Sequence, residues 1–275
     1  MFKKIYLEIT NICNLSCSFC HRTKRKQKFM TEEEFKLLSK KISYHTKYLY
    51  FHLMGEPLLH PNFGRFLHIA TEDGFKITVA TNGFLIKKRE NELLDTPPYK
   101  ITFSLHSYEA NKTDISLSEY LYGIINFCKK AEKKGTICVL RLWNNEGENL
   151  LNEEILNTLQ EEFTFRENRK GFTLSDRIYL EFADKFIWPD KEAPTQDVTF
   201  CMGLRDHIGV LCDGSVVPCC LDADGEITLG NLFTEELEDI INKPRSRAIY
   251  KGFSERYSVE NLCSRCQYAT RFNTK

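Results

Sequence analysis

The segment NICNLSCSFC, residues 11–20, follows directly after the first strand-like stretch of the chain. Its three cysteines, Cys13, Cys17 and Cys20, are separated by three and then two residues. Three thiolates at this spacing can bind three irons of a [4Fe–4S] cluster and leave the fourth iron without a protein ligand. A zinc site that borrows a distant fourth ligand is the alternative, but zinc motifs generally pair two short spacings, and only His21 is nearby. The segment therefore predicts an iron–sulfur centre with an open coordination position.

The composition is that of one large domain, or of a domain of about 200 residues with a small appendage. The 275 residues carry 38 basic and 38 acidic side chains, so no net field attracts nucleic acid or a membrane surface. The chain has no signal-peptide pattern at its start and no run near the roughly 20 apolar residues that span a bilayer. We therefore expect a cytoplasmic protein, in which eleven cysteines indicate metal binding or redox chemistry rather than disulfides.

Outward from the cysteine loop, short β-branched or aromatic runs alternate with helical stretches, which predicts repeated βα units and a parallel sheet. Six such units predict a partial (β/α)6 TIM-like barrel, an α/β fold. The expected strands are residues 5–10, 48–54, 75–81, 101–106, 136–142 and 178–182.

Helix boundaries are marked by local signals. Thr31 with Glu34 predicts a capping box, and Gly74 is expected to end the second helix. Near the other end of the chain, Thr234 is expected to cap a helix that Pro244 stops.

Polar residues are expected inside the barrel. Alternate residues of a barrel strand face the lumen, which places Leu49, Phe51 and Leu53 against the helices. A single inward polar residue can be explained by a register that is off by one position, or by a core polar group that has its hydrogen bonds. Six strands that all place polar residues inward favour a polar pocket at their carboxyl ends. The residues expected to point inward are Glu8, Tyr50, His52, Met54, Asn82, Ser104, His106, Arg141 and Glu181.

The rhythm breaks at residues 188–197, WPDKEAPTQD, which contain two prolines and mixed charges. We place a domain boundary there, between residues 1–187 and residues 188–275. Asp213-Gly214, between two short apolar runs, then predicts a β-hairpin in the second part.

A second group of cysteines lies in this part. The hairpin would bring Cys201 near Cys219, and the pair Cys263 and Cys266 would complete a closed site of four thiolates. Cys220 is an alternative to Cys219, and spacing alone does not separate iron–sulfur from zinc. Three other cysteines are expected to be small core residues: Cys128, Cys138 and Cys212.

The C-x3-C-x2-C segment after the first strand, with aromatic Phe19 before its last cysteine, resembles the radical S-adenosylmethionine (radical SAM) superfamily. In that family SAM chelates the open iron, and an electron from the cluster cleaves SAM to give a 5′-deoxyadenosyl radical. GEPLLH, residues 55–60, resembles the glycine-glutamate-proline motif that holds the SAM amino group, with Met54 where many members have glycine. The resemblance implies these SAM-binding residues: Gly55, Glu56, Pro57, Asn82, Ser104 and Arg141.

The pattern from Cys201 through Gly214 to Cys219 resembles the opening of the SPASM extension of radical SAM enzymes. Because the chain ends nine residues after Cys266, it resembles the shorter "twitch" form, which carries one auxiliary [4Fe–4S] cluster. The resemblance thus implies two [4Fe–4S] clusters and SAM as cofactors.

This reading implies an oxidoreductase that modifies a peptide or protein by hydrogen abstraction, with an external donor such as flavodoxin or ferredoxin and no membrane partner. The alternatives are a small-molecule dehydrogenase of the alcohol or aminocyclitol type and an RNA-modifying enzyme. The RNA-modifying enzyme would bind RNA through the basic run Lys24–Lys28. A non-enzymatic, metal-stabilised RNA-binding module would use the same run. Otherwise this run is a solvated turn. By position alone, His52, His106 and Glu181 are candidate acid–base residues.

Overall fold

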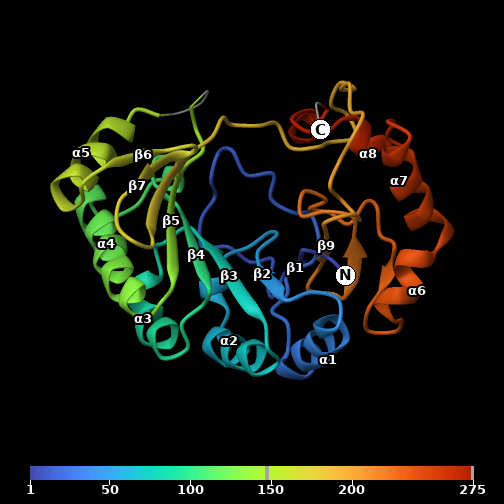
Figure 1. Ribbon diagram of the computed structural model, residues 1–275, viewed down its shortest axis with the longest axis horizontal. Helices are drawn as coiled ribbons and strands as arrows, with labels where there is room; N and C mark the ends of the chain where they lie inside the picture. The colour runs from blue at the N-terminus through green and yellow to red at the C-terminus, as the bar shows by residue number, and fades with distance from the viewer. Residues whose placement is uncertain (146–148, 274–275) are drawn as a thin grey trace.

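The computed structural model describes residues 1–145 and 149–273. Within these residues one curved sheet runs through the molecule (Figure 1). Its eleven strands lie in the order β11 (Gly230–Asn231), β10 (Ser215–Val217), β9 (His207–Val210), β1 (Lys4–Leu7), β2 (Tyr48–Phe51), β3 (Lys76–Thr81), β4 (Lys100–Ser104), β5 (Ile137–Leu142), β8 (Ile178–Phe182), β7 (Gly171–Thr173) and β6 (Arg166–Asn168).

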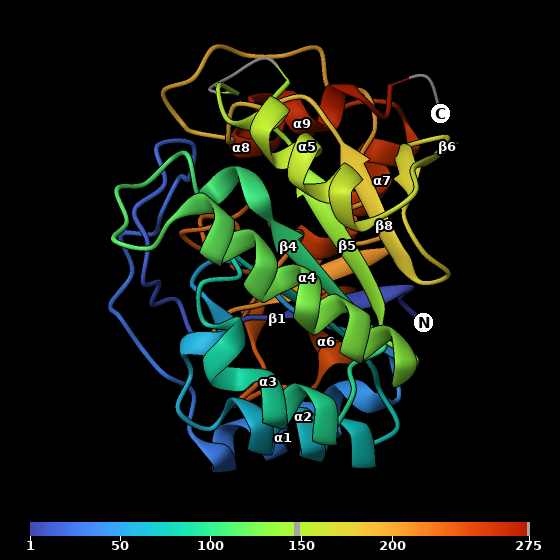
Figure 2. The same cartoon turned by 90° about the vertical axis from the view of Figure 1, so that its left-hand side faces the viewer.

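Helices cover the outer side of this sheet, as Figures 1 and 2 show. The five that alternate with the parallel strands are α1 (Glu32–Ser43), α2 (Phe63–Glu72), α3 (Ile86–Asp95), α4 (Leu117–Lys133) and α5 (Asn152–Glu162). The C-terminal part adds α6 (Leu237–Asn242), α7 (Pro244–Ser254), α8 (Asn261–Ser264) and α9 (Gln267–Thr270). No helix of the described residues is long and apolar enough to cross a membrane.

The six expected parallel strands are present, and β1, β2, β3, β4, β5 and β8 pair in parallel in that order. Three of them end earlier than expected because turns follow. The amide of His52 bonds to the carbonyl of Tyr50 (2.9 Å) just after β2, and residues Leu105–Ser107 form a 3-10 turn after β4. Each turn brings polar side chains to the carboxyl edge of the sheet.

The early end of β2 corrects one expectation about the lumen. Leu49 and Phe51 are fully buried on the helix side, as expected. Leu53 instead packs on the inner side of the sheet with Tyr6 and Val217, since the strand alternation stops before it.

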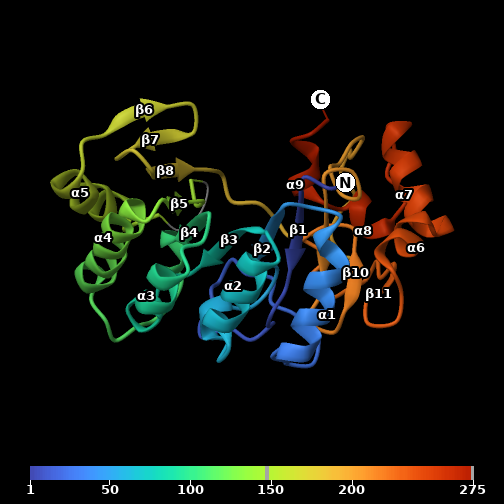
Figure 3. The same cartoon turned by 60° about the horizontal axis from the view of Figure 1, so that its bottom comes forward.

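The C-terminal part is joined to the barrel by hydrogen bonds that the sequence did not predict. Strand β9 pairs in parallel with β1, and the expected hairpin at Gly214 (φ +83°) joins β9 to β10. The β6–β7 hairpin extends the opposite edge of the sheet (Figure 3). Residues 1–187 and 188–275 thus share one sheet, and the boundary between them remains a prediction.

The helix signals were partly right. The Thr31–Glu34 capping box is present, and Gly74 follows α2 with a φ of +84°. Thr234 does not cap a helix, because its hydroxyl donates to the carbonyl of Asn231 and α6 begins three residues later. Pro244 occupies the first turn of α7, where its missing N–H is tolerated.

Candidate functional site

The three cysteines of the first loop lie between β1 and α1, with Cys13 exposed and the other two half-buried. Each thiol faces an N–H donor: Leu15 N lies 3.4 Å from Cys13 Sγ, and Arg22 N lies 3.4 Å from Cys20 Sγ. Asn111 Nδ2 lies 3.1 Å from Cys17 Sγ. Hydrogen bonds to sulfur stabilise thiolates and tune iron–sulfur clusters, so this donor set fits a cluster held by the loop.

A glycine turn supports the start of this loop. The amide of Glu56 donates to the carbonyl of Ile12 at 2.9 Å. Gly55 has a φ of +75°, and a Cβ on it would lie 2.4 Å from the carbonyl oxygen of Thr10. Glycine is therefore required at position 55 for two reasons: the positive φ, and the close approach of the cysteine loop.

We expect Gly55→Ala to lower the free energy of unfolding by roughly 3 kcal/mol, since it adds a backbone clash to the strain of a positive φ. Gly74→Ala is the matched control: its φ is +84°, but its Cβ would meet no atom within 4 Å. We expect the control to cost only about 1 kcal/mol. Chemical denaturation of both proteins measures the difference, and equal costs would show that the contact with the loop is unimportant.

Glu56 connects two of the turns at the carboxyl edge. Its buried carboxylate accepts hydrogen bonds from Thr81 Oγ1 (2.8 Å), Asn82 N (2.8 Å) and Leu58 N (3.0 Å). Burial raises the pKa of Glu56 to about 7. The Asn82 amide donates to Asn14 Oδ1 (2.9 Å), in the cysteine loop. Both residues therefore adjoin the predicted SAM pocket, and their contact with SAM remains a prediction.

His106 and Ser104 lie at the end of β4. His106 is buried with its ring 4.8 Å from the ring of Phe19, and its Nδ1 lies 3.2 Å from the carbonyl of Arg141. Burial lowers the pKa of His106 to about 4, so its ring is neutral at pH 7. Ser104 is half-buried at the same edge. The structure thus places this edge against the cysteine loop.

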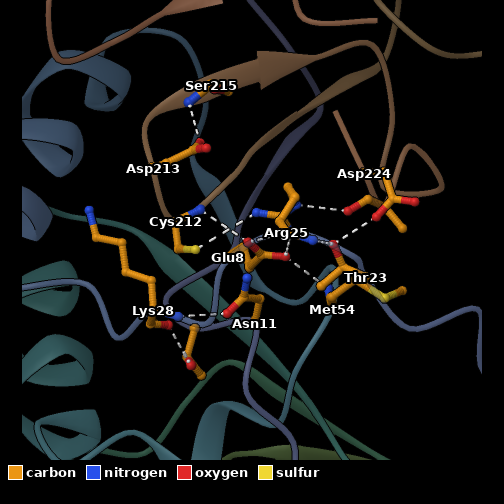
Figure 4. A network of polar contacts seen from close by, with 12 residues as sticks. Glu8, Asn11, Thr23, Arg25, Lys28, Met54, Cys212, Asp213, Ser215 and Asp224 are labelled. Carbon is orange, nitrogen blue, oxygen red and sulfur yellow. Dashed lines mark hydrogen bonds and ion pairs between the residues drawn. The ribbon is translucent and has the colours of Figure 1, made fainter. Parts of the chain in front are cut away.

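Glu8, which was expected to point inward, is engaged in hydrogen bonds and an ion pair. Its side chain is fully buried, and Arg25 Nη2 donates to both of its carboxylate oxygens, at 2.6 and 2.9 Å (Figure 4). The amides of Met54 (3.3 Å) and Cys212 (3.1 Å) also donate to it. Glu8 therefore joins the first strand, the cysteine loop and the C-terminal hairpin.

The same stretch of the loop bonds further into the C-terminal part. Arg25 Nε donates to the carbonyl of Ala223 at 2.9 Å. Asp224 accepts from Thr23 Oγ1 (2.9 Å) and Lys24 N (2.8 Å). Lys28 pairs with Glu34 at 2.5 Å, so two of the four basic residues of the run are engaged in ion pairs.

Arg25→Ala should destabilise the protein by about 4 kcal/mol, because it leaves a buried carboxylate without its counter-charge. Lys26→Ala, an exposed neighbour in the same run, should change the free energy of unfolding by less than about 0.5 kcal/mol. Replacing both charged partners, Glu8→Gln with Arg25→Met, should recover part of the loss. Urea denaturation of the three proteins tests this, and equal stability of the two single variants contradicts it.

The four cysteines of the second group line a single cavity. Burial raises the pKa of the Cys219 thiol, and the neighbouring thiols, Cys220 first and then the other three of the set, raise it further. Cys220 turns away from this cavity and packs beside Tyr6 and Tyr50 on the inner side of the sheet. The cavity is lined by Cys201, Cys219, Cys263 and Cys266, together with apolar side chains and Asp222.

Within the described residues, no group of three or more Cys, His, Asp or Glu side chains is arranged to hold a single metal ion. A cubane cluster has different needs, because each thiolate binds its own iron. The remaining cysteines match their expectation, since Cys128, Cys138 and Cys212 are buried.

Several residues that shape the site were missed by sequence reasoning. Asn111 contacts Cys17, and Trp188 Nε1 donates to the carbonyl of Phe19 at 3.1 Å. His21 stacks on Trp188, with ring centroids 5.9 Å apart. Asn111 and Trp188 belong to no motif, so no local signal could have identified them, and His21 entered only as a possible zinc ligand.

Two family models match the chain. The model described as the radical SAM superfamily covers residues 7–160, which is more than half of the chain. The SPASM model, described as an iron–sulfur cluster-binding domain, covers residues 201–267. Each match includes one of the two cysteine groups.

Several known proteins are similar in sequence. The chain is 30% identical over 131 residues to the tungsten-containing aldehyde ferredoxin oxidoreductase cofactor-modifying protein of Pyrococcus furiosus, covering 44% of this chain and 36% of that protein. It is 22% identical over 296 residues to the antilisterial bacteriocin subtilosin biosynthesis protein AlbA of Bacillus subtilis, covering 95% and 64%. The GTP 3′,8-cyclase of Aquifex aeolicus is 25% identical over 310 residues, covering 93% and 91%. The chain spans less than two thirds of the first two relatives.

Solved structures share the fold. BtrN in complex with AdoMet and 2-DOIA superposes with a TM-score of 0.64 at 20% identity, covering 97% of this chain and 93% of that one. SuiB of Streptococcus suis bound to S-adenosylmethionine gives a TM-score of 0.63 at 15% identity, covering 90% and 68%. At these identities the likeness concerns architecture.

Proposed function

The chain belongs to the radical SAM superfamily, and from this premise we propose that it oxidatively modifies a peptide or protein by hydrogen abstraction. Membership with a SPASM domain implies a SAM-binding [4Fe–4S] cluster and an auxiliary iron–sulfur cluster. The observation that carries the proposal is the pair of thiol sets, three on one loop and four around one cavity.

Cys13, Cys17 and Cys20 would hold the SAM cluster, and Cys201, Cys219, Cys263 and Cys266 the auxiliary one. When bound, these groups and SAM supply a 5′-deoxyadenosyl radical that takes a hydrogen atom, and an acceptor for the second electron of the oxidation. Four protein thiols saturate the auxiliary site, which supports a role in electron transfer rather than in substrate binding.

An oxidation that removes a hydrogen atom and an electron also releases a proton. His52 is exposed, with its ring 6.0 Å from the ring of Tyr6, whereas His106 is buried and Glu181 lies 3.8 Å from Arg141. Desolvation inside the barrel, and then the charges of Arg141 and Lys4, lowers the pKa of His52 to about 4. The ring is therefore neutral at pH 7, and we propose His52 as the proton acceptor.

A peptide substrate is supported by relatives. AlbA, a bacteriocin biosynthesis protein, matches 95% of this chain. SuiB is similar in structure (TM-score 0.55) in its form bound to the precursor peptide SuiA. An external reductant such as flavodoxin or ferredoxin and a reducing, cytoplasmic location complete the proposal.

A small-molecule dehydrogenase is the second candidate. BtrN, crystallised with 2-DOIA, and this chain cover each other almost completely, at 93% and 97%. RNA modification has less support, because Arg25 and Lys28 of the basic run are engaged in internal ion pairs.

The test uses anaerobically reconstituted protein with SAM, a reductant and host extract that has been treated with protease, treated with ribonuclease or passed through a size filter. Formation of 5′-deoxyadenosine above the substrate-free background is measured. We expect protease to abolish the stimulation and ribonuclease to leave it unchanged. Stimulation by the small-molecule filtrate alone would favour the dehydrogenase, and no SAM cleavage in a protein with both clusters would overturn the enzymatic assignment.

A further inference from the structure

Three basic side chains point into the barrel from different strands: Lys4 on β1, Lys100 on β4 and Arg141 on β5. Their direction follows from strand alternation, because each has a buried neighbour on the helix side: Ile5, Ile101 and Leu140. All three are half-buried. A lumen that serves only stability would hold apolar side chains here.

These cations lack sufficient counter-charge among the described residues. Glu181 lies 3.8 Å from Arg141 Nε but is shared with Lys170, at 3.6 Å. The Arg141 Nε is buried and has no hydrogen-bond partner. A buried charge that is not paired costs several kcal/mol, and SAM, to which Arg141 is assigned above, would supply an anion for this guanidinium.

The two lysines have no ion pair in the described part of the chain. Lys4 Nζ lies only over the rings of Tyr6 and Tyr50, 4.9 and 5.0 Å from their centroids. Asp206, whose charge acts on Lys4, pairs with Lys3 at 2.8 Å.

The charges are close enough to act on one another. Burial lowers the pKa of Lys100, and the charge of Arg141 lowers it further. The same two causes act on Lys4, where the nearby Cys220 and Asp206 oppose them. Like charges gathered in a site of low dielectric repel, and an anion among them relieves this repulsion.

Solvent reaches this space. His52 is exposed although it is on the inner side of the barrel, and the charges of both Arg141 and Lys4 act on its pKa. The lumen is thus open to a ligand at the carboxyl end of β2.

We propose that Lys4 and Lys100 bind a carboxylate of the substrate, and that the substrate is an acidic peptide. This inference rests on the proposed function and names the class of peptide. RNA is disfavoured because its backbone needs a continuous basic track, whereas these cations are inside the barrel.

The position of Lys100 also sets the distance between the bound carboxylate and the edge of the sheet near the cysteine loop. Lys100 and Ser104 are the first and last residues of β4, and Ser104 is at the edge that faces the cysteine loop. Four residues of strand span about 13 Å. In an extended peptide, the acidic residue would therefore lie about four positions from the modified one.

The experiment measures binding without turnover. Reconstituted protein with both clusters and SAM is titrated anaerobically against three fluorescent probes: a decapeptide of alternating glycine and glutamate, its glutamine counterpart and a decauridylate. Fluorescence anisotropy gives the affinities of the wild type, Lys100→Gln, Lys4→Gln and the control Lys47→Gln, an exposed lysine just before β2. Iron content confirms that each variant is folded and loaded.

We expect the glutamate peptide to bind more tightly than the glutamine peptide, and each lumen variant to weaken it about tenfold, as loss of one charged hydrogen bond would. Lys47→Gln should bind as the wild type does. Equal affinity for the two peptides, or unchanged binding by both lumen variants, overturns the proposal. Tighter binding of decauridylate that is lost in these variants also overturns it, in favour of phosphate recognition. The binding measurement needs no oxidation of the peptide. Failure of the peptide-modification proposal is therefore detected separately, when a peptide substrate does not stimulate 5′-deoxyadenosine formation.

Discussion

Replacing Cys13, Cys17 and Cys20 together with alanine should abolish SAM cleavage and lower the iron content from about eight to about four atoms per chain. The reason is chemical: these thiols are the only protein ligands proposed for the SAM cluster, while the second set lies in a separate cavity of the C-terminal part. Iron analysis after anaerobic reconstitution, with 5′-deoxyadenosine measured alongside, gives both numbers.

Cys128→Ala is the matched control, because Cys128 is a fully buried thiol of α4 that belongs to neither set. It should retain about eight irons and full SAM cleavage. Iron that stays near eight in the triple variant would show that the loop binds no cluster, and stoichiometric zinc without iron in the wild type would favour the structural zinc site instead.

Features that depend on neighbouring residues were predicted well. The six parallel strands, the Thr31–Glu34 cap and the hairpin at Gly214 each follow from periodicity or turn chemistry within a few positions. The cysteine loop was recognisable for the same reason, since its three thiols lie within eight residues of each other.

Contacts between distant parts of the chain were not predictable. Asn111 and Cys17 are 94 positions apart, and Thr23 and Asp224 are 201 apart. The pairing of β9 with β1 joins the C-terminal part to the first strand of the barrel in the same way. Such pairs are selected by the folded geometry, so a single sequence holds no spacing that reports them.

The contacts of Arg25 show how such long-range contacts change a functional interpretation. In the sequence, Lys24–Lys28 is a basic run with either a solvated or a nucleic-acid-binding role. In the structure, Arg25 neutralises the buried Glu8 and bonds to the C-terminal part beside Ala223. Its charge therefore pairs inside the protein. Arg25 connects the loop of Cys13, Cys17 and Cys20 to the C-terminal part, which carries the second cysteine group.

Cys219 and Cys220 could not be ranked from the sequence, because both fit the spacing equally well. The structure separates them: Cys219 lines the cavity with the other three thiols, whereas Cys220 packs beside Tyr6. Both residues lie in the bend that follows β10, and this bend turns the two side chains to different sides.

Cys219→Ala should therefore lower the iron content from about eight to about four atoms per chain, because a cluster with three of its four thiolates is lost or labile. Cys220→Ala, which removes the same atom one position later, should retain about eight irons. The variants carry the same substitution at adjacent half-buried sites, so a general loss of stability affects both. Iron analysis and the iron–sulfur absorbance of the anaerobically purified proteins measure the difference. If Cys220→Ala loses the iron and Cys219→Ala keeps it, the ligand assignment is reversed, and the thiol beside Tyr6 then belongs to the cluster rather than to the lumen.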